Sequence, residues 1–155
     1  MKRKEFIRNS GGVLLGTVLS PNLIANTNLN SRINLGVIGT GGRGQGIIKI
    51  LNKLSNFNVI GACDTIPFRL QEGFDLIKGN RKAKAFKDYR KLLDDKNIDG
   101  VIISTPLNTH DKIAVDAVDA DKHVYCEKTL AKGASAIARI VNKCKTSKKI
   151  FQTGH

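Results

Sequence analysis

The chain has 155 residues, a length that suits one domain with a hydrophobic core of its own. It carries 26 lysine and arginine residues against 13 aspartate and glutamate residues, so its formal net charge is +13. The basic residues occur singly or in pairs without interleaved aromatic side chains. This pattern argues against a nucleic-acid partner and favours a solvated basic surface.

Residues 1–30 have the layout of a secretory signal and its linker. A basic start at residues 2–8 is followed by a short apolar stretch at residues 11–19 and then by polar residues. The apolar stretch is too short to span a bilayer, so we expect no stable membrane anchor. Arg3 and Lys4 resemble the start of a twin-arginine signal, with Lys4 in place of the second arginine. The segment predicts an exported, periplasmic protein. An amphipathic N-terminal helix is the alternative, and an unused signal would leave the protein cytoplasmic.

Beyond residue 30, short apolar runs alternate with helical patterns. Six strands are predicted, at Ile33–Ile38, Asn58–Cys63, Ala83–Phe86, Gly100–Ser104, His123–Cys126 and Ile150–Gln152. Five helices are predicted, at Arg43–Leu54, Ile66–Leu76, Tyr89–Asp94, Asp111–Ala120 and Ala134–Lys145. Thr65 as N-cap, with Pro67 in the first turn, marks the start of the second helix. The alternation predicts the α/β class, with residues 31–155 forming one doubly wound parallel sheet with right-handed crossovers.

A glycine-rich turn joins the first predicted strand to the first helix. Gly39, Gly41 and Gly44 form the pattern Gly-x-Gly-x-x-Gly, and the second strand ends in Asp64. These glycines allow a tight turn, close approach of a pyrophosphate and close helix packing, so the order of parts predicts a Rossmann dinucleotide site. Asp64 would accept hydrogen bonds from ribose hydroxyls and repel a 2′-phosphate, which favours NAD over NADP. The expected cofactor-binding residues of this region are Gly39, Thr40, Gly41, Gly42, Arg43, Gly44 and Asp64.

Two further strands end in polar residues that could face a nicotinamide cofactor, because ligands of such sheets bind at the carboxyl ends of the strands. These residues are Ser104, Thr105, Pro106, His110, Glu127 and Lys128. His110 either contacts the cofactor or packs locally at the start of its helix. Lys128 is suited to proton transfer if it is desolvated; the alternative is a surface ion pair with Glu127, which would contribute little.

The three cysteines have no CxxC pattern and no metal-ligand spacing, so no metal site is expected. Cys63 and Cys126 lie at the ends of apolar runs, which predicts buried free thiols rather than a disulfide.

In combination, these motifs resemble the N-terminal half of the Gfo/Idh/MocA family, named after glucose–fructose oxidoreductase, inositol dehydrogenase and rhizopine catabolism. The matching segments, in order, are Gly39–Gly44, Cys63-Asp64, Ser104–Pro106 with His110, and Tyr125–Lys128. The resemblance implies an NAD(P)-dependent oxidoreductase that transfers hydride to or from a small-molecule sugar, cyclitol or related polyol. Lys128 matches the family's catalytic lysine, which relays the proton of the substrate hydroxyl, whereas Thr129 stands where the family has proline.

The resemblance also implies that other catalytic residues belong to a C-terminal α/β domain. We therefore expect residues 31–155 to be a Rossmann domain truncated at its C-terminal end, inactive by itself, with a homo-oligomer expected for a full-length form. Two alternatives remain open: the cofactor domain of an NAD-dependent glycosidase, and a non-catalytic fragment that binds NAD.

Overall fold

The computed structural model describes residues 32–77, 80 and 82–154. The signal-like segment predicted at residues 1–30 lies outside the described residues. All elements belong to the second of two units, residues 32–155.

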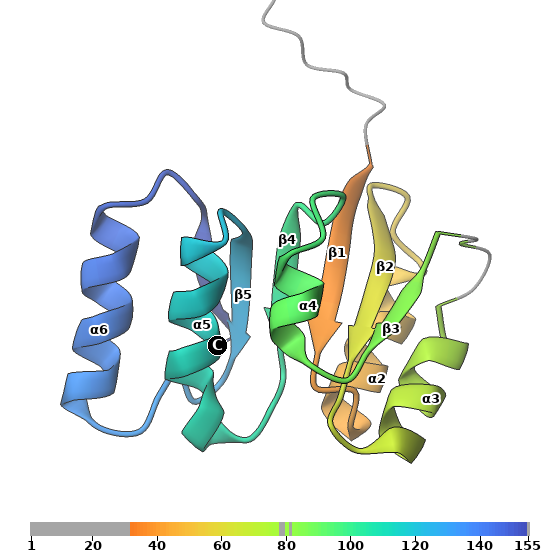
Figure 1. The fold of residues 1–155 in the computed structure, drawn as a ribbon, viewed down its shortest axis with the longest axis horizontal. Helices are drawn as coiled ribbons and strands as arrows, with labels where there is room; N and C mark the ends of the chain where they lie inside the picture. The colour runs from red at the N-terminus through yellow and green to blue at the C-terminus, as the bar shows by residue number, and fades with distance from the viewer. Residues whose placement is uncertain (1–31, 78–79, 81, 155) are drawn as a thin grey trace, which may run out of the picture. The chain divides into compact units, whose positions relative to one another are not determined.

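The described part of the chain forms a six-stranded sheet with helices on both faces (Figure 1). The strands are β1 (Ile33–Ile38), β2 (Phe57–Cys63), β3 (Lys84–Phe86), β4 (Gly100–Ile103), β5 (His123–Glu127) and β6 (Phe151–Gly154). Their order is β3-β2-β1-β4-β5-β6, and all neighbours are parallel. The predicted doubly wound parallel sheet is confirmed.

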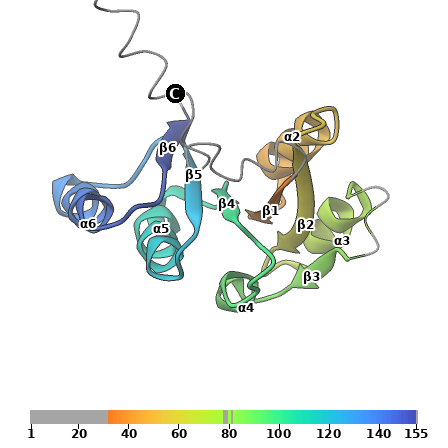
Figure 2. The ribbon, with the colours of Figure 1, turned by 90° about the horizontal axis from the view of Figure 1, so that it is seen from above.

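The helices divide between the two faces because the chain leaves β1 in one direction and β4 in the other. They are α2 (Gly42–Leu51), α3 (Pro67–Asp75), α4 (Tyr89–Leu93), α5 (His110–Asp119) and α6 (Ala134–Lys145). Figure 2 shows α4, α5 and α6 along one face and α2 and α3 along the other. Right-handed crossovers produce this arrangement when the strand order reverses beside the first strand.

Each face of the sheet has its own apolar core. Under α4, α5 and α6 the core includes Leu92, Ile103 and Ile140, and under α2 it includes Val37 and Ile48. These side chains are fully or almost fully buried. The buried parts of β1, β2 and β4 are therefore apolar runs rather than alternating patterns, because they are covered on both faces.

Cys63 and Cys126 are buried free thiols, as predicted, and Cys144 is half-buried and also free. Burial raises the pKa of both buried thiols to about 12, with the carboxylate of Asp64 or Glu127 adding to the effect. These thiols therefore stay protonated and unreactive near neutral pH.

The face that carries α2 and α3 is only partly covered among the described residues. Beside α2, an apolar hollow of about 510 Å³ extends over β4, β5 and β6, and its lining includes Ile33, Leu35, Ile102, Tyr125 and Ile150. No described helix is long and apolar enough to cross a bilayer.

The predicted start of the second helix is wrong in one detail. Ile66, not Thr65, is the N-cap of α3, and Pro67 begins the helix. The Asp64 carboxylate accepts the Ile66 N–H at 2.9 Å, so the neighbouring acid takes the part expected of the Thr65 hydroxyl. The first helix also ends at Leu51 rather than Leu54, since the chain tightens there into turns.

Candidate functional site

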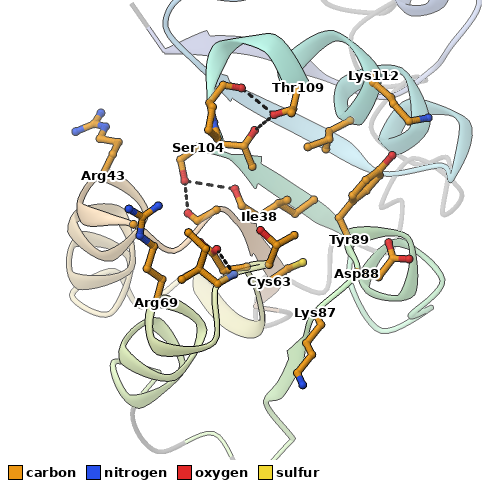
Figure 3. A pocket seen from close by; sticks show the side chains of 18 of the residues that line it. Ile38, Arg43, Cys63, Arg69, Lys87, Asp88, Tyr89, Ser104, Thr109 and Lys112 are labelled. Carbon is orange, nitrogen blue, oxygen red and sulfur yellow. Dashed lines mark hydrogen bonds between the residues drawn. The ribbon is translucent and has the colours of Figure 1, made fainter.

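A large cleft in the described part of the chain lies where the strand order reverses, at the carboxyl ends of the strands. It has a volume of about 850 Å³ and is lined by the ends of β1, β2 and β4 (Figure 3). Two hydrogen bonds hold the ends of β1 and β4 together: the Ser104 amide donates to Ile38 O at 2.8 Å, and the Ser104 hydroxyl donates to Gly39 O at 2.6 Å. Open α/β sheets bind their ligands at this switch point.

The glycine turn packs closely on its inner side and is open on its outer side. Gly39 has a φ of +88°, and a Cβ atom there would lie 2.7 Å from the Ser104 carbonyl carbon. At Gly44 a Cβ atom would lie 2.0 Å from Gly39 O, so only glycine lets α2 start this close to β1. Gly41 and Gly42 line the cleft, and a Cβ atom added to either would meet nothing within 4 Å. The open side leaves room for a pyrophosphate at the N-terminus of α2.

Asp64 organises the turn from the end of β2. Its Oδ2 accepts the Thr40 N–H at 2.9 Å, while its Oδ1 accepts the Ile66 N–H at 2.9 Å. Thr40 is fully buried, and its hydroxyl donates to Arg69 O at 2.8 Å, so it supports the turn from beneath. A carboxylate has about four acceptor positions, so these bonds leave room for ribose hydroxyls.

The opposite wall of the cleft contains residues that the sequence analysis missed. Lys87, Asp88 and Tyr89 follow β3, and Lys112 comes from α5. Figure 3 shows Arg69 at the other end of the cleft, on the same side as Arg43. Ligands of such sheets bind at the carboxyl ends of the strands. If the short β3 is counted among these strands, the same rule predicts residues 87–89 as part of the site.

A second cavity of about 650 Å³ adjoins the first. Arg43, Ser104 and Thr105 line both cavities, whereas Glu127 and Lys128 line the second one only. Lys128 is exposed, and its peptide bond to Thr129 is cis. The structure thus places the predicted catalytic lysine beside the predicted Ser104–Pro106 loop.

Glu127 pairs with Arg43, not with its neighbour Lys128. Arg43 donates to Glu127 Oε1 from Nη2 at 2.6 Å and from Nε at 2.8 Å, and the Tyr125 hydroxyl donates to the same oxygen at 3.2 Å. Burial disfavours ionisation of Glu127, but the bonds and charge of Arg43 outweigh it and lower the pKa of this carboxyl. Tyr125 was not among the predicted site residues, although its position two residues before Glu127 on one strand puts both on the same face.

His110 is in neither cavity. It is the first residue of α5, is 2% exposed, and has both ring nitrogens within hydrogen-bond distance of backbone carbonyls. Of the two interpretations left open by the sequence, the buried ring and its contacts with backbone carbonyls favour local packing.

A profile of the GFO/IDH/MocA family, described as an oxidoreductase family with an NAD-binding Rossmann fold, matches residues 33–155. The chain belongs to this family. Among GFO/IDH/MocA relatives, inositol 2-dehydrogenase of Salmonella typhimurium is 34% identical over 124 residues, which are 79% of this chain and 36% of that protein. A protein of Stenotrophomonas maltophilia named glycosyl hydrolase family 109 protein is 34% identical over 135 residues, or 82% of this chain and 29% of that one.

The fold comparison agrees with the sequence comparison. The crystal structure of myo-inositol dehydrogenase from Lactobacillus casei in complex with NAD(H) and myo-inositol matches with a TM-score of 0.73 and 31% identity. The match covers 79% of this chain and 36% of that one. This GFO/IDH/MocA chain thus corresponds to the NAD-binding domain of its relatives and spans about a third of the length of the inositol dehydrogenases.

Proposed function

We propose that this chain is the cofactor-binding part of an enzyme that moves a hydride between NAD and a hydroxyl-bearing carbon of a cyclitol, sugar or related polyol. The observation that carries the proposal is the open glycine turn. Gly41 and Gly42 have free space around them at the start of α2 and line the same cleft as Asp64. The similarity to inositol dehydrogenases supports the choice of substrate class.

The residues of the cleft fit a dinucleotide. Backbone amides at the start of α2 would hold the pyrophosphate, and Asp64 would accept bonds from the adenosine ribose. Ser104 and Thr105 would face the nicotinamide end, because they line the cavity that also contains Lys128. Bound NAD would supply the hydride acceptor. Lys128 would hold the substrate hydroxyl and relay its proton through Nζ.

Binding is tested by titrating the 155-residue chain with NADH and following nicotinamide fluorescence. We expect saturable binding that ADP-ribose competes away. Gly41→Val should fold normally, because Gly41 has an ordinary φ of −65° and its Cβ would meet no neighbour. The side chain would occupy the space expected for the pyrophosphate, so affinity should fall by about tenfold or more. A wild-type chain that binds neither ligand, or a Gly41→Val chain that binds normally, would contradict the proposal.

Cofactor choice is the second part of the proposal. We expect NADH to bind more tightly than NADPH, since a 2′-phosphate would meet the Asp64 carboxylate. Arg43 and Arg69 line the same cleft and could offset this repulsion. Parallel titrations of wild type and Asp64→Asn measure the preference, and the variant should bind the two cofactors more equally. Equal or tighter NADPH binding that Asp64→Asn leaves unchanged would count against Asp64 as the selector.

A second candidate function follows from the similarity to the glycosyl hydrolase family 109 protein. In that case the same cofactor site would serve a transient oxidation that enables glycosidic cleavage. The protein isolated from its host, given NAD, would separate the two functions. Steady NADH formation with myo-inositol supports the dehydrogenase, and release of an aryl alcohol from an aryl glycoside without net NADH supports the glycosidase.

Export to the periplasm is proposed from the basic start, apolar stretch and polar linker of residues 1–30. Fractionation of the native host should then place the protein outside the cytoplasm with roughly the first 25 residues removed. A cytoplasmic protein that retains Met1 would refute this proposal.

A further inference from the structure

We propose that His110 is a positioning residue that joins the two loops facing the nicotinamide end of the cleft. Through these loops it would orient the nicotinamide and Lys128 without touching either. The inference rests on the proposed function, because it assigns the loops at Thr105 and Lys128 to the nicotinamide half of the cofactor.

The His110 ring bridges these loops directly. Its Nε2 lies 2.8 Å from Thr105 O, and its Nδ1 lies 2.9 Å from Thr129 O. Thr105 lines both cavities, and Thr129 directly follows Lys128. The ring therefore ties the loop after β4 to the loop after β5.

The position of this bridge follows from where the sheet ends. β4 and β5 pair with each other only as far as Ile103 and Cys126, so the loops at Thr105 and Lys128 lie beyond this ladder. The side chain of His110 supplies the link between these two loops. Because the ring is 2% exposed, water cannot easily substitute for its bonds.

The two contacts of the His110 ring can be removed one at a time by mutation. Both partners are carbonyl oxygens, which only accept hydrogen bonds. A neutral imidazole donates from one nitrogen, and a doubly protonated ring donates from both. At this position, Asn approximates the donor at Nδ1, Gln approximates the donor at Nε2, and Phe fills the space with no donor. His110→Asn should thus keep the bond to Thr129, and His110→Gln the bond to Thr105.

Lys122 offers a matched control at the amino ends of the strands, opposite the cleft. It is also buried, and its Nζ donates to two backbone carbonyls, Asp95 O at 2.9 Å and Ile98 O at 2.8 Å. Both carbonyls precede β4, far along the strands from the cleft. Lys122→Met therefore removes buried polar contacts with two carbonyls, as His110→Phe does, without affecting the loops of the site.

The experiment compares the affinities of the full chain and its variants for NADH and for ADP-ribose, which lacks nicotinamide. We expect His110→Phe to weaken NADH by about tenfold while ADP-ribose affinity changes less than about twofold. The Asn and Gln variants should fall in between, with altered fluorescence of bound NADH. Lys122→Met should lower the unfolding temperature and leave both affinities unchanged.

A measurement on the unaltered chain accompanies the variants. The ring nitrogen signals of His110 in NMR spectra should change on addition of NADH but not of ADP-ribose. Equal changes with both ligands, or equal weakening of both ligands in the His110 variants, would overturn the positioning role and leave a purely structural one. If the wild-type chain binds neither ligand, the proposed function itself fails.

Discussion

At the scale of single residues, the site depends on a charge pair between distant parts of the chain. Arg43 is in the first turn of α2, and Glu127 is the last residue of β5, 84 positions later. The Glu127 side chain is only 7% exposed, whereas that of Arg43 is 59% exposed. A buried carboxylate needs such partners to remain ionised, so Arg43 sustains the negative charge beside Lys128.

Replacing Arg43 by Met should raise the pKa of Glu127. Burial persists in the variant while the bonds and charge of the guanidinium are lost. In the wild type, the lowered pKa of Glu127 stabilises the fold above the pKa of the unfolded chain, about 4.3, and this contribution disappears as pH falls through the folded pKa. The variant should lack this stabilisation.

Carbon NMR titration of the glutamate carboxyls, with unfolding curves between about pH 3 and 6, measures both effects. Arg139→Met serves as control, because Arg139 pairs with Asp111 away from Glu127. A Glu127 titration that Arg43→Met leaves unchanged would show that other groups hold its charge.

The cysteines provide a second prediction at this scale. Near pH 8, Cys63 and Cys126 should react with a thiol reagent far more slowly than Cys144, because burial raises the pKa of the first two to about 12. Mass spectrometry of the labelled chain identifies the sites, and denaturant should make all three react alike. Rapid labelling of Cys63 in the native chain would contradict the burial of β2.

At the scale of elements, the contact between α2 and β1 decides the geometry of the glycine turn. Gly44 sits against Gly39 O, whereas Gly46, two residues further along the same helix, has open space beside it. Both glycines lie in α2, but only Gly44 is tightly packed. Comparing alanine variants at the two positions therefore separates the effect of close packing from that of helix propensity.

Gly44→Ala should destabilise the domain by about 1–3 kcal/mol or more and weaken NADH binding, because the new Cβ would lie 2.0 Å from a backbone oxygen. Gly46→Ala should instead stabilise it by about 0.5–1 kcal/mol, since alanine favours a helix interior. Urea unfolding and NADH titration of both variants test this pair. A tolerated Gly44→Ala would mean that α2 can move away from β1 at little cost.

At the scale of the whole molecule, the described residues form one domain with a cofactor cleft. The match covers only 36% of the length of its relatives among the inositol dehydrogenases. Hydride transfer requires the substrate carbon about 3–3.5 Å from the nicotinamide, and holding a substrate in this way accounts for much of enzymatic rate enhancement. We therefore expect cofactor binding to be measurable separately from turnover in the 155-residue polypeptide.

We expect the 155-residue polypeptide to bind NADH without appreciable turnover. Assays with NAD and a panel of sugars and cyclitols, beside a full-length inositol dehydrogenase, should show rates far below about 1 per second. The cofactor-binding titration on the same sample confirms that the chain is folded. Turnover at ordinary enzyme rates that vanishes in Lys128→Ala would show that this chain is a complete catalyst.

The sequence by itself determined the fold class, the position of the glycine turn and the strand bounds to within two residues. These features depend on local patterns: apolar runs of strand length, helical periodicity and glycines at fixed spacing. The bounds of β1 and α6 were predicted to the residue, because each has a strong pattern and clear flanking breaks. The short β3 was predicted more weakly, since three residues have little periodicity.

Only the tertiary structure decided how the residues of the site work together. It showed that Arg43 rather than Lys128 pairs with Glu127, that Asp64 holds the turn through Thr40, and that the buried His110 ring contacts Thr129 O. Each of these contacts joins segments that meet only because parallel strands end at one edge of the sheet. Their partners are set by the order of strands and the packing of helices, which no local pattern in the sequence encodes.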